Sequence, residues 1–261
     1  DSPRGPLVVN PGGPGGSGVD YAAAADRVVT PQLHDAFDIV GFDPRGVGKS
    51  QPLNCLTGSQ IDEFLATDAT PDDQQEADTL VTESKEFGAD CLAASAEMTA
   101  HIGSTNVVKD MDILRSALNQ QTLDYLGFSY GTLLGAMYAD EFTDRVGRFV
   151  LDGAMDPSLS NTEIAKGQAL GFEVAIQRYI DHCIAEGKCP LGNDPVQAKQ
   201  KLQTFLDSLD ANPLPTGDAN RPLTQALAMN AVIYPLYQPD YGWPLLTTAL
   251  TLDRKSTRLN S

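Results

Sequence analysis

The sequence contains one G-x-S-x-G motif, the run Gly127-Phe-Ser-Tyr-Gly131. In such a motif a strand turns into a helix so sharply that the serine backbone is strained, and glycines two residues to either side avoid a collision. The turn presents the serine hydroxyl at the carboxyl edge of a sheet, beside a helix N-terminus. The motif therefore predicts that Ser129 is a nucleophile for acyl transfer. An ordinary tight turn is the alternative.

Acyl transfer also requires backbone N–H groups directed at the oxygen that becomes negative in the transition state. Tyr130, the residue after the nucleophile, is expected to supply one of them. The second should come from a loop that follows an earlier strand, and the Gly/Pro-rich run at residues 10–18 follows the apolar residues 7–9. We expect the N–H of Gly13 to be this second donor, with Gly12 as the next candidate.

A phosphate-binding role for the glycine-rich segments is disfavoured. For residues 10–18, no acidic residue that could bind a ribose follows a second strand in the register of a dinucleotide-binding fold. The segment 46–50, Gly-Val-Gly-Lys-Ser, resembles the end of a P-loop, but Asp43 stands where that motif requires its first glycine. No cofactor is therefore expected.

Apolar patterning predicts strands that alternate with helices in the first part of the chain. The strands are expected at residues 7–9, 37–42, 122–127 and 146–151, and the helices at 21–29, 72–94, 106–118 and 130–142. Ser104 or Thr105 is expected to cap the helix at 106–118. Alternating strands and helices indicate an α/β fold with a mainly parallel sheet flanked by helices.

After Pro157 the pattern becomes helical, with helices expected at 163–186, 195–209 and 222–237. We therefore expect a core at residues 1–157 and a helical cap at 158–252. The last nine residues, 253–261, resemble a translated sequencing adapter and are expected to be a non-native tail. No run of apolar residues is long enough to span a bilayer, and the chain does not start with a signal peptide.

The composition limits the partners of the protein. The chain has 18 Lys and Arg against 35 Asp and Glu, a formal net charge of −17. This balance argues against binding to nucleic acid, which needs clustered cations, and against an anionic membrane surface. It is compatible with a cationic ligand such as the free amino end of a peptide, or simply with a solvated acidic surface. The sequence does not indicate an oligomeric state.

Four segments together resemble the secreted tripeptidyl aminopeptidases of actinobacteria, in the proline iminopeptidase branch of the α/β-hydrolase superfamily. They are residues 9–18, 38–50, 127–132 and 145–153, in the order and spacing of that family. The resemblance implies an α/β-hydrolase fold with a helical cap. It also implies a serine exopeptidase that releases short peptides from free N-termini, in a protein that is secreted or associated with the cell envelope.

The sequence departs from this family in its catalytic base. The acid and histidine of the family's triad lie beyond the cap, and this chain ends before that region. His34 and His101 precede Ser129, outside the usual chain order, and His182 is expected on a cap helix. We therefore expect a sheet that is incomplete at both ends, in a fragment that is inactive alone. An esterase or lipase, or a catalytically dead peptide-binding relative, is the alternative function.

The remaining candidates are the cysteines and two groups of charged residues. Four cysteines allow three disulfide pairings, and the resemblance supports Cys55–Cys91 and Cys183–Cys189. Free thiols are the alternative, and a zinc site is disfavoured because no Cys-x-x-Cys is present. Glu173 is a candidate for binding the substrate ammonium. Asp43 and Arg45 are expected to form an ion pair that braces the oxyanion loop, the Gly/Pro-rich run at residues 10–18.

Overall fold

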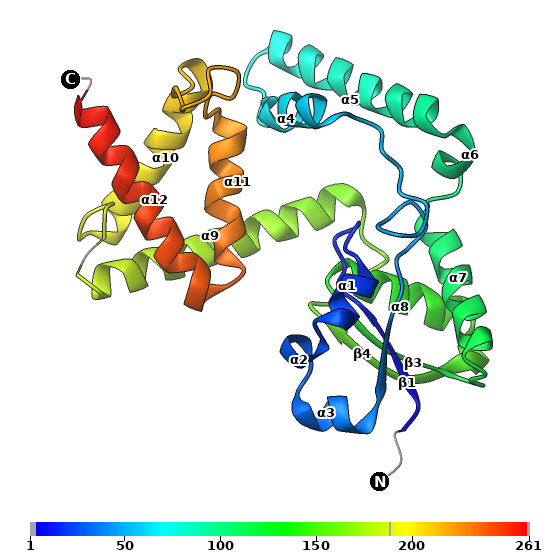
Figure 1. Ribbon diagram of the computed structural model, residues 1–261. Helices are drawn as coiled ribbons and strands as arrows, with labels where there is room; N and C mark the ends of the chain where they lie inside the picture. Colours follow the sequence, from blue (N-terminus) through cyan, green and yellow to red (C-terminus); the bar gives the residue numbers. More distant parts are fainter. Residues whose placement is uncertain (1–3, 188, 260–261) are drawn as a thin grey trace. The chain divides into compact units, whose positions relative to one another are not determined.

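The computed structural model describes residues 4–187 and 189–259, with side chains through Leu252. The chain divides into two compact units (Figure 1). The first contains residues 1–55 and 88–160, and the second contains residues 56–87 and 161–261. Residues 56–87 therefore group with the helices that follow residue 160.

The first unit is built on a parallel sheet, as predicted. Its strands are β1 (Pro6–Asn10), β2 (Asp38–Gly41), β3 (Leu123–Phe128) and β4 (Val146–Asp152). They lie in the order β2-β1-β3-β4, and each neighbouring pair is parallel. Since all four strands run in the same direction, the residues that follow them meet at one edge of the sheet. That edge carries Ser129 after β3 and the Gly/Pro run after β1.

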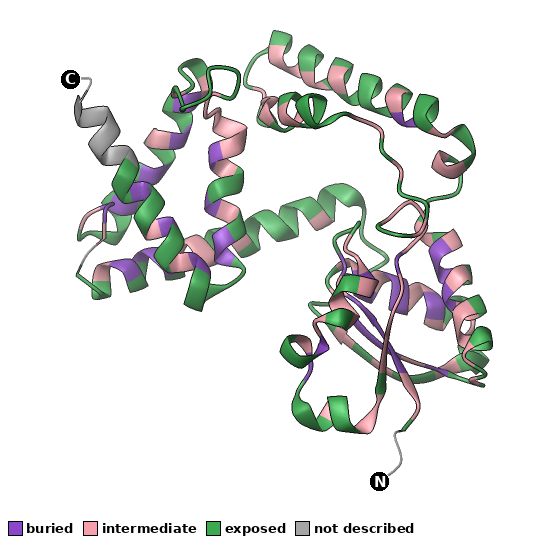
Figure 2. Cartoon of the chain, viewed as in Figure 1, coloured by how far each residue is buried: buried purple, intermediate pink, exposed green. Residues whose placement is uncertain are grey.

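Helices cover both faces of this sheet, which explains why β1 is a continuous apolar run. Leu7 and Val9 pack on one side, in a cluster that includes side chains of α1 (Gly18–Ala23), α2 (Ala25–Val28) and α3 (Pro31–Ala36). Val8 packs on the other side, with α7 (Ser104–Ala117) and α8 (Tyr130–Glu141). The buried residues accordingly concentrate on the inner strands and on the helix faces turned to them (Figure 2).

The cap of α7 differs from the expectation. Gly103, in an extended conformation, precedes the helix and provides no side-chain cap, while Ser104 is already its first residue. The Ser104 hydroxyl instead forms a 2.7 Å hydrogen bond with the phenol of Tyr130. The side chain is therefore used for a tertiary contact with the start of α8.

The second unit is helical. Its main core lies among α9 (Asn161–Ala185), α10 (Pro195–Ala211), α11 (Gln225–Leu236) and α12 (Pro239–Leu259). The first half of α9 is exposed along most of its length, and its second half enters the core (Figure 2). The other helices of the chain are α4 (Gly58–Ala66), α5 (Gln74–Ala94), α6 (Ala96–Thr99) and the short 3₁₀ helix η1 (Thr143–Arg145).

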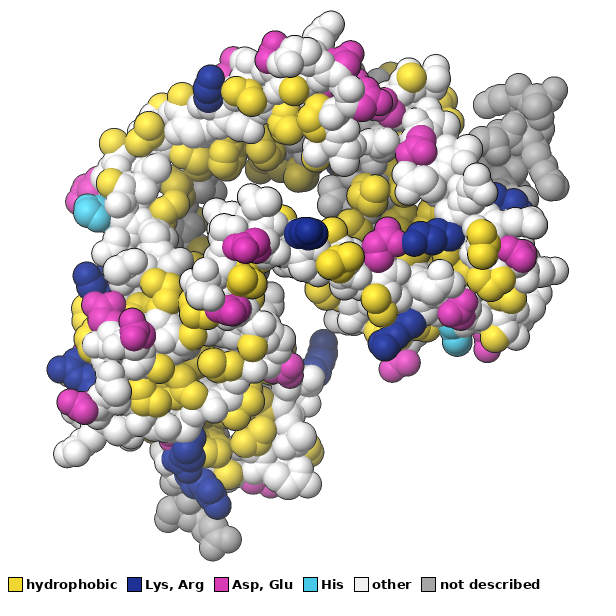
Figure 3. Space-filling model, turned by 180° about the vertical axis from the view of Figure 1, so that it is seen from behind, with side chains coloured by type: hydrophobic (Ala, Val, Ile, Leu, Met, Phe, Trp, Pro, Cys, Tyr) yellow, Lys and Arg dark blue, Asp and Glu magenta, His cyan; other side chains and the backbone are white. Residues whose placement is uncertain are grey.

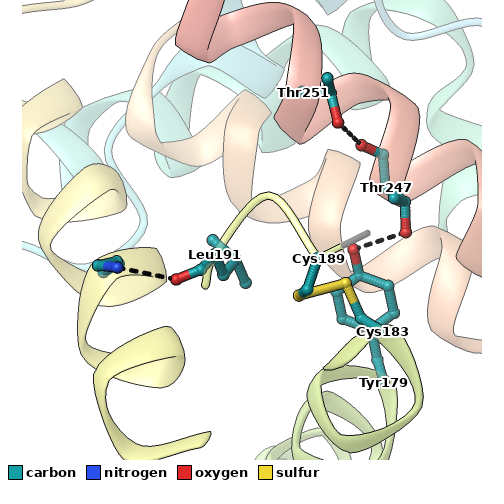
Figure 4. Close-up of a disulfide and its surroundings, with 7 residues drawn as sticks. Tyr179, Cys183, Cys189, Leu191, Thr247 and Thr251 are labelled. Atoms are coloured by element: carbon teal, nitrogen blue, oxygen red, sulfur yellow. Dashed lines mark hydrogen bonds between the residues drawn. A yellow bond between two sulfur atoms is a disulfide. The ribbon is translucent and has the colours of Figure 1, made fainter. Parts of the chain in front are cut away.

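Two features bear on the sequence predictions: the helix α12 in the second unit, and one disulfide in each unit. The helix α12 was not expected, and it extends into residues 253–259. Both predicted disulfides are present in the structure, and together they use all four cysteines of the sequence. The Cys183–Cys189 bridge joins α9 to the loop that follows it, and a 3.0 Å hydrogen bond between Tyr179 and Thr247 joins α9 to α12 (Figure 4).

Charged side chains are dispersed over the face of the molecule that Figure 3 shows. On the face drawn in Figure 3, many Lys and Arg side chains stand singly or beside acidic ones. Ion pairs such as Arg148–Asp124 and Lys199–Glu173 are of this type. Among the described residues, the helices are all too short or too polar to cross a lipid bilayer.

Candidate active site

Ser129 lies at a strained turn between β3 and α8. It has φ 52° and ψ −122°, in a region that residues other than glycine rarely adopt. Its N–H donates a 2.9 Å hydrogen bond to the carbonyl oxygen of Asp152, at the end of β4. Its carbonyl oxygen accepts a 2.6 Å bond from the Thr132 hydroxyl. The turn is therefore held from both sides, while the serine itself is exposed.

The glycines of the motif are required by packing. A Cβ atom on Gly127 would lie 2.6 Å from the carbonyl oxygen of Gly131. A Cβ atom on Gly131 would lie 2.8 Å from the backbone oxygen of Asn10. Backbone atoms cannot move aside as a flexible side chain can, so both positions exclude a side chain. This is the collision that the sequence motif predicts.

The loop after β1 contacts this turn. Gly12, at φ +87°, lies so close to it that a Cβ atom would be 3.0 Å from the Tyr130 nitrogen and 3.1 Å from the Ser129 Cβ. The N–H of Gly12 already donates a 2.9 Å hydrogen bond to the side-chain oxygen of Asn10. Within the part of the chain that the structure describes, the N–H groups of Gly13 and Tyr130 donate no hydrogen bond. These two donors are therefore free to receive an anionic oxygen.

Asp43 holds the far end of this loop. Its side chain is buried, accepts a 2.6 Å hydrogen bond from the Ser17 hydroxyl, and accepts two more from the backbone N–H groups of Val19 and Lys49. Burial acts to raise the pKa of Asp43, but these hydrogen bonds to the charged form outweigh it, so the pKa is below its ordinary value.

The predicted ion pair between Asp43 and Arg45 is wrong. Arg45 makes a two-pronged ion pair with Asp110 of α7, with N–O distances of 2.7 and 2.6 Å, and also donates to the carbonyl oxygen of His101. Asp43 instead accepts hydrogen bonds from Ser17 and from two backbone N–H groups, so these bonds, and not an ion pair with Arg45, brace the loop.

The three histidines occupy other environments. His34 is on α3, just before β2 and thus toward the amino ends of the strands, where its ring lies 3.6 Å from Asp26. The ring of His101 is exposed in the turn before α7. His182, in the helical unit, packs against Trp243 with the ring centres 5.1 Å apart. Among the described residues, the Ser129 hydroxyl has no hydrogen bond to any of them.

Glu173 lies on α9 in the helical unit. Its side chain is 52% exposed and forms an ion pair with Lys199 of α10. A carboxylate with a lysine partner can bind an ammonium group only by exchanging that partner. The structure therefore gives Glu173 a surface ion pair as its present contact.

One group of acidic residues has the spacing of metal ligands. Carboxylate oxygens of Asp68, Glu76 and Asp210, all partly exposed, lie within 4.8 Å of one another in the helical unit. Desolvation and then the neighbouring charges, that of Glu76 first, raise the pKa of Asp210. Sequence pattern does not reveal this group, because Asp68 and Asp210 are far apart in the chain. Acidic clusters of this type are common on protein surfaces, and no role is assigned to this one.

Comparison with known proteins agrees with this geometry. Residues 5–248 match the family described as alpha/beta hydrolase fold. The protein named serine protease Hip1 of Mycobacterium tuberculosis is 37% identical over 256 residues, which cover 95% of this chain and 49% of that protein. The carboxylesterase B of Mycobacterium tuberculosis is 39% identical over 250 residues, 94% of this chain and 48% of that protein.

A third relative is named as a member of the family that the four sequence segments resemble. The tripeptidyl aminopeptidase of Streptomyces lividans is 39% identical over 157 residues, 59% of this chain and 29% of that protein. The chain thus spans about half the length of the first two relatives.

Proposed function

The chain belongs to the alpha/beta hydrolase fold family, and on that premise we propose that it carries the nucleophile of a serine hydrolase, Ser129. The observation that supports this most is the exposed serine at a strained strand-to-helix turn, against which Gly12 of the loop after β1 is packed. The N–H groups of Tyr130 and Gly13 have no hydrogen-bond acceptor among the described residues. A serine held at positive φ costs free energy that a purely structural turn could avoid with glycine.

The proposed reaction begins with attack of the Ser129 oxygen on an acyl carbon. The carbonyl oxygen becomes negative and accepts hydrogen bonds from the N–H groups of Tyr130 and Gly13. The C–N or C–O bond then breaks, the leaving group takes a proton, and an ester to Ser129 remains. Water hydrolyses this ester in a second step that uses the same two donors.

The reaction requires a base for the serine proton, and we propose that residues outside these 261 supply it. None of the three histidines is hydrogen-bonded to the Ser129 hydroxyl in the described structure, and the relatives are about twice as long as this chain. Removing the histidine of a serine protease lowers kcat by about 10⁶. We therefore expect the 261 residues alone to show almost no turnover.

The proposed substrate is a peptide with a free N-terminus, from which short peptides such as tripeptides are released. The similarity to a protein named tripeptidyl aminopeptidase supports this class. The excess of acidic residues also suits a substrate with an ammonium group. Glu173 remains our candidate for binding that group, with Lys199 as the partner that it must exchange.

An ester hydrolase is the second candidate, because a relative named carboxylesterase B matches 94% of the chain with 39% identity. The same fold and the same kind of nucleophile serve peptide and ester hydrolysis, so the turn at Ser129 fits both reactions. We further propose that the protein is secreted or associated with the cell envelope. Both disulfides support this, since such bonds persist mainly in oxidising compartments.

The test uses protein expressed from the complete reading frame. A fluorophosphonate probe is expected to label it at Ser129, as mapped by mass spectrometry, and Ser129→Ala should abolish both labelling and turnover. Hydrolysis of a tripeptide p-nitroanilide is then compared with that of p-nitrophenyl butyrate.

The outcomes separate the candidates. Turnover of the anilide supports the peptidase, and turnover of the ester alone supports the esterase. A folded protein that Ser129→Ala leaves unchanged in labelling and turnover refutes the serine hydrolase proposal. A folded protein that binds peptides without cleaving them is a catalytically dead relative.

A further inference from the structure

Asn10 is a buried polar residue beside the catalytic turn. It is the last residue of β1 and is only 1% exposed. In the sheet it lies opposite Gly127, the first glycine of the motif. Burial of an amide side chain is unfavourable unless it forms hydrogen bonds, so its contacts indicate what the residue does here.

The side chain of Asn10 fixes the direction of the oxyanion loop. Its Oδ1 accepts the N–H of Gly12 at 2.9 Å, two residues along the chain, as asparagine often does in tight turns. This bond removes the Gly12 N–H from the set of available donors. The next N–H, that of Gly13, has no partner among the described residues.

The same side chain also contacts the helix that follows the nucleophile. A Cβ atom on Gly131 would lie 2.8 Å from Oδ1 of Asn10, so the amide packs directly against the first turn of α8. The first residue of that helix is Tyr130, the other donor. One buried side chain therefore touches both segments that carry the two donors.

We propose that Asn10 is a positioning residue for the oxyanion hole, setting the separation of the Gly13 and Tyr130 N–H groups through its contacts with Gly12 and Gly131. This inference rests on the proposed function. A positioning residue of this kind affects the transition state more than substrate binding, because the negative oxygen exists only during reaction.

The experiment compares Asn10→Ala and Asn10→Ser in protein from the complete reading frame. Alanine and serine leave nearly the same space, but only the serine hydroxyl can accept the Gly12 N–H, more weakly than asparagine. Asn10→Ala is expected to lower kcat about 10- to 100-fold, with KM within about threefold. Asn10→Ser should recover part of that loss. If Asn10→Ala does not fold, the rate of Asn10→Ser is compared with that of wild type instead.

Two further measurements separate positioning from simple stability. The affinity for a peptidyl trifluoromethyl ketone, which forms a tetrahedral adduct with the serine, should fall in parallel with kcat/KM. The control is Val8→Ala, on the same strand and 1% exposed, whose side chain packs in the core and not on the loop. It should lower the melting temperature without lowering kcat of the folded protein.

The results distinguish this inference from the proposed function. The role of Asn10 is overturned, and the proposed function kept, if wild type is active at Ser129 but the two variants have the same kcat as each other or as wild type. So does a loss of kcat that Val8→Ala reproduces. A folded wild-type protein that neither reacts at Ser129 nor turns over substrate overturns both.

Discussion

Replacing Gly12 with alanine tests whether the loop at residues 10–18 is packed against the turn at Ser129. Two costs are expected. Gly12 has φ +87°, where an L-residue costs about 1–2 kcal/mol. A Cβ atom there would also lie 3.0 Å from the Tyr130 nitrogen, and closer still to the carbonyl oxygen of Phe128. Overpacking of this kind costs about 1–3 kcal/mol more.

Gly15 provides the matched control. It lies in the same loop with φ +100°, but a Cβ atom on it would meet no other atom within 4 Å. Gly15→Ala therefore carries the conformational cost alone. The difference in the free energy of unfolding between the two variants, measured by urea denaturation, isolates the contact with the turn and is expected to be about 1–3 kcal/mol.

Activity provides the second measurement. Because the new methyl group would push against Tyr130 and Phe128, Gly12→Ala should slow fluorophosphonate labelling of Ser129 at least about tenfold, whereas Gly15→Ala should leave it near wild type. Equal stabilities together with equal labelling rates for the two variants would refute the packing that we describe between the loop and the turn.

The remaining predictions concern pH and the disulfides. The pKa of Asp43 is lowered in the folded chain, so its carboxylate adds stability above the unfolded-state pKa near 4, and this stability is lost as the pH falls through the folded-state value. Asp43→Asn should therefore lower the free energy of unfolding by about 1–3 kcal/mol at pH 7. This difference from wild type should disappear as the pH falls in an acid titration followed by circular dichroism. A difference that does not change with pH would contradict this. Replacing the Cys55–Cys91 bridge, which spans 36 residues, by two serines should cost about 4 kcal/mol on the chain-entropy model, against about 2 kcal/mol for Cys183–Cys189, which spans 6. Equal losses in thermal melting of the two double variants would contradict this order.

The features that sequence predicted best are those encoded locally. The strand, the strained serine and the helix around Ser129 are contiguous, and the glycine spacing itself reports the steric conflict that the structure contains. The contact between Asn10 and Gly12 also had a local signal, since asparagine two residues before a glycine is typical of such a turn. That signal identifies a turn but does not indicate that the side chain also packs on α8.

Neither α4 nor α12 was predicted from the sequence: α4 has a local start signal that was overlooked, whereas α12 has a local signal against a helix. The helix α4 has a readable start, because Thr57 and Gln60 form a reciprocal capping box. The helix α12 carries proline at position 244, inside its helical run, which normally argues against a helix. Its first half is held by tertiary packing of Leu246 and Leu250 in the core.

The partner of Arg45 could not have been predicted from local pattern. Asp110 is 65 residues away, and several acidic residues are nearer in the chain. The sequence indicated a charged pair near the loop, but a fold was needed to choose between the possible carboxylates. The choice matters, because Arg45 joins the turn after β2 to α7, and Asp43 is left to hold Ser17.

The hydrogen bond from Ser129 to Asp152 links the proposed nucleophile to β4, an outer strand of the described sheet. Asp152 is paired in the sheet with Phe128, the residue that directly precedes Ser129. When the end of β4 frays, the Ser129 amide loses its acceptor and the strained turn is free to relax. The conformation of Ser129 thus depends on the pairing of β3 with β4 at the carboxyl ends of both strands.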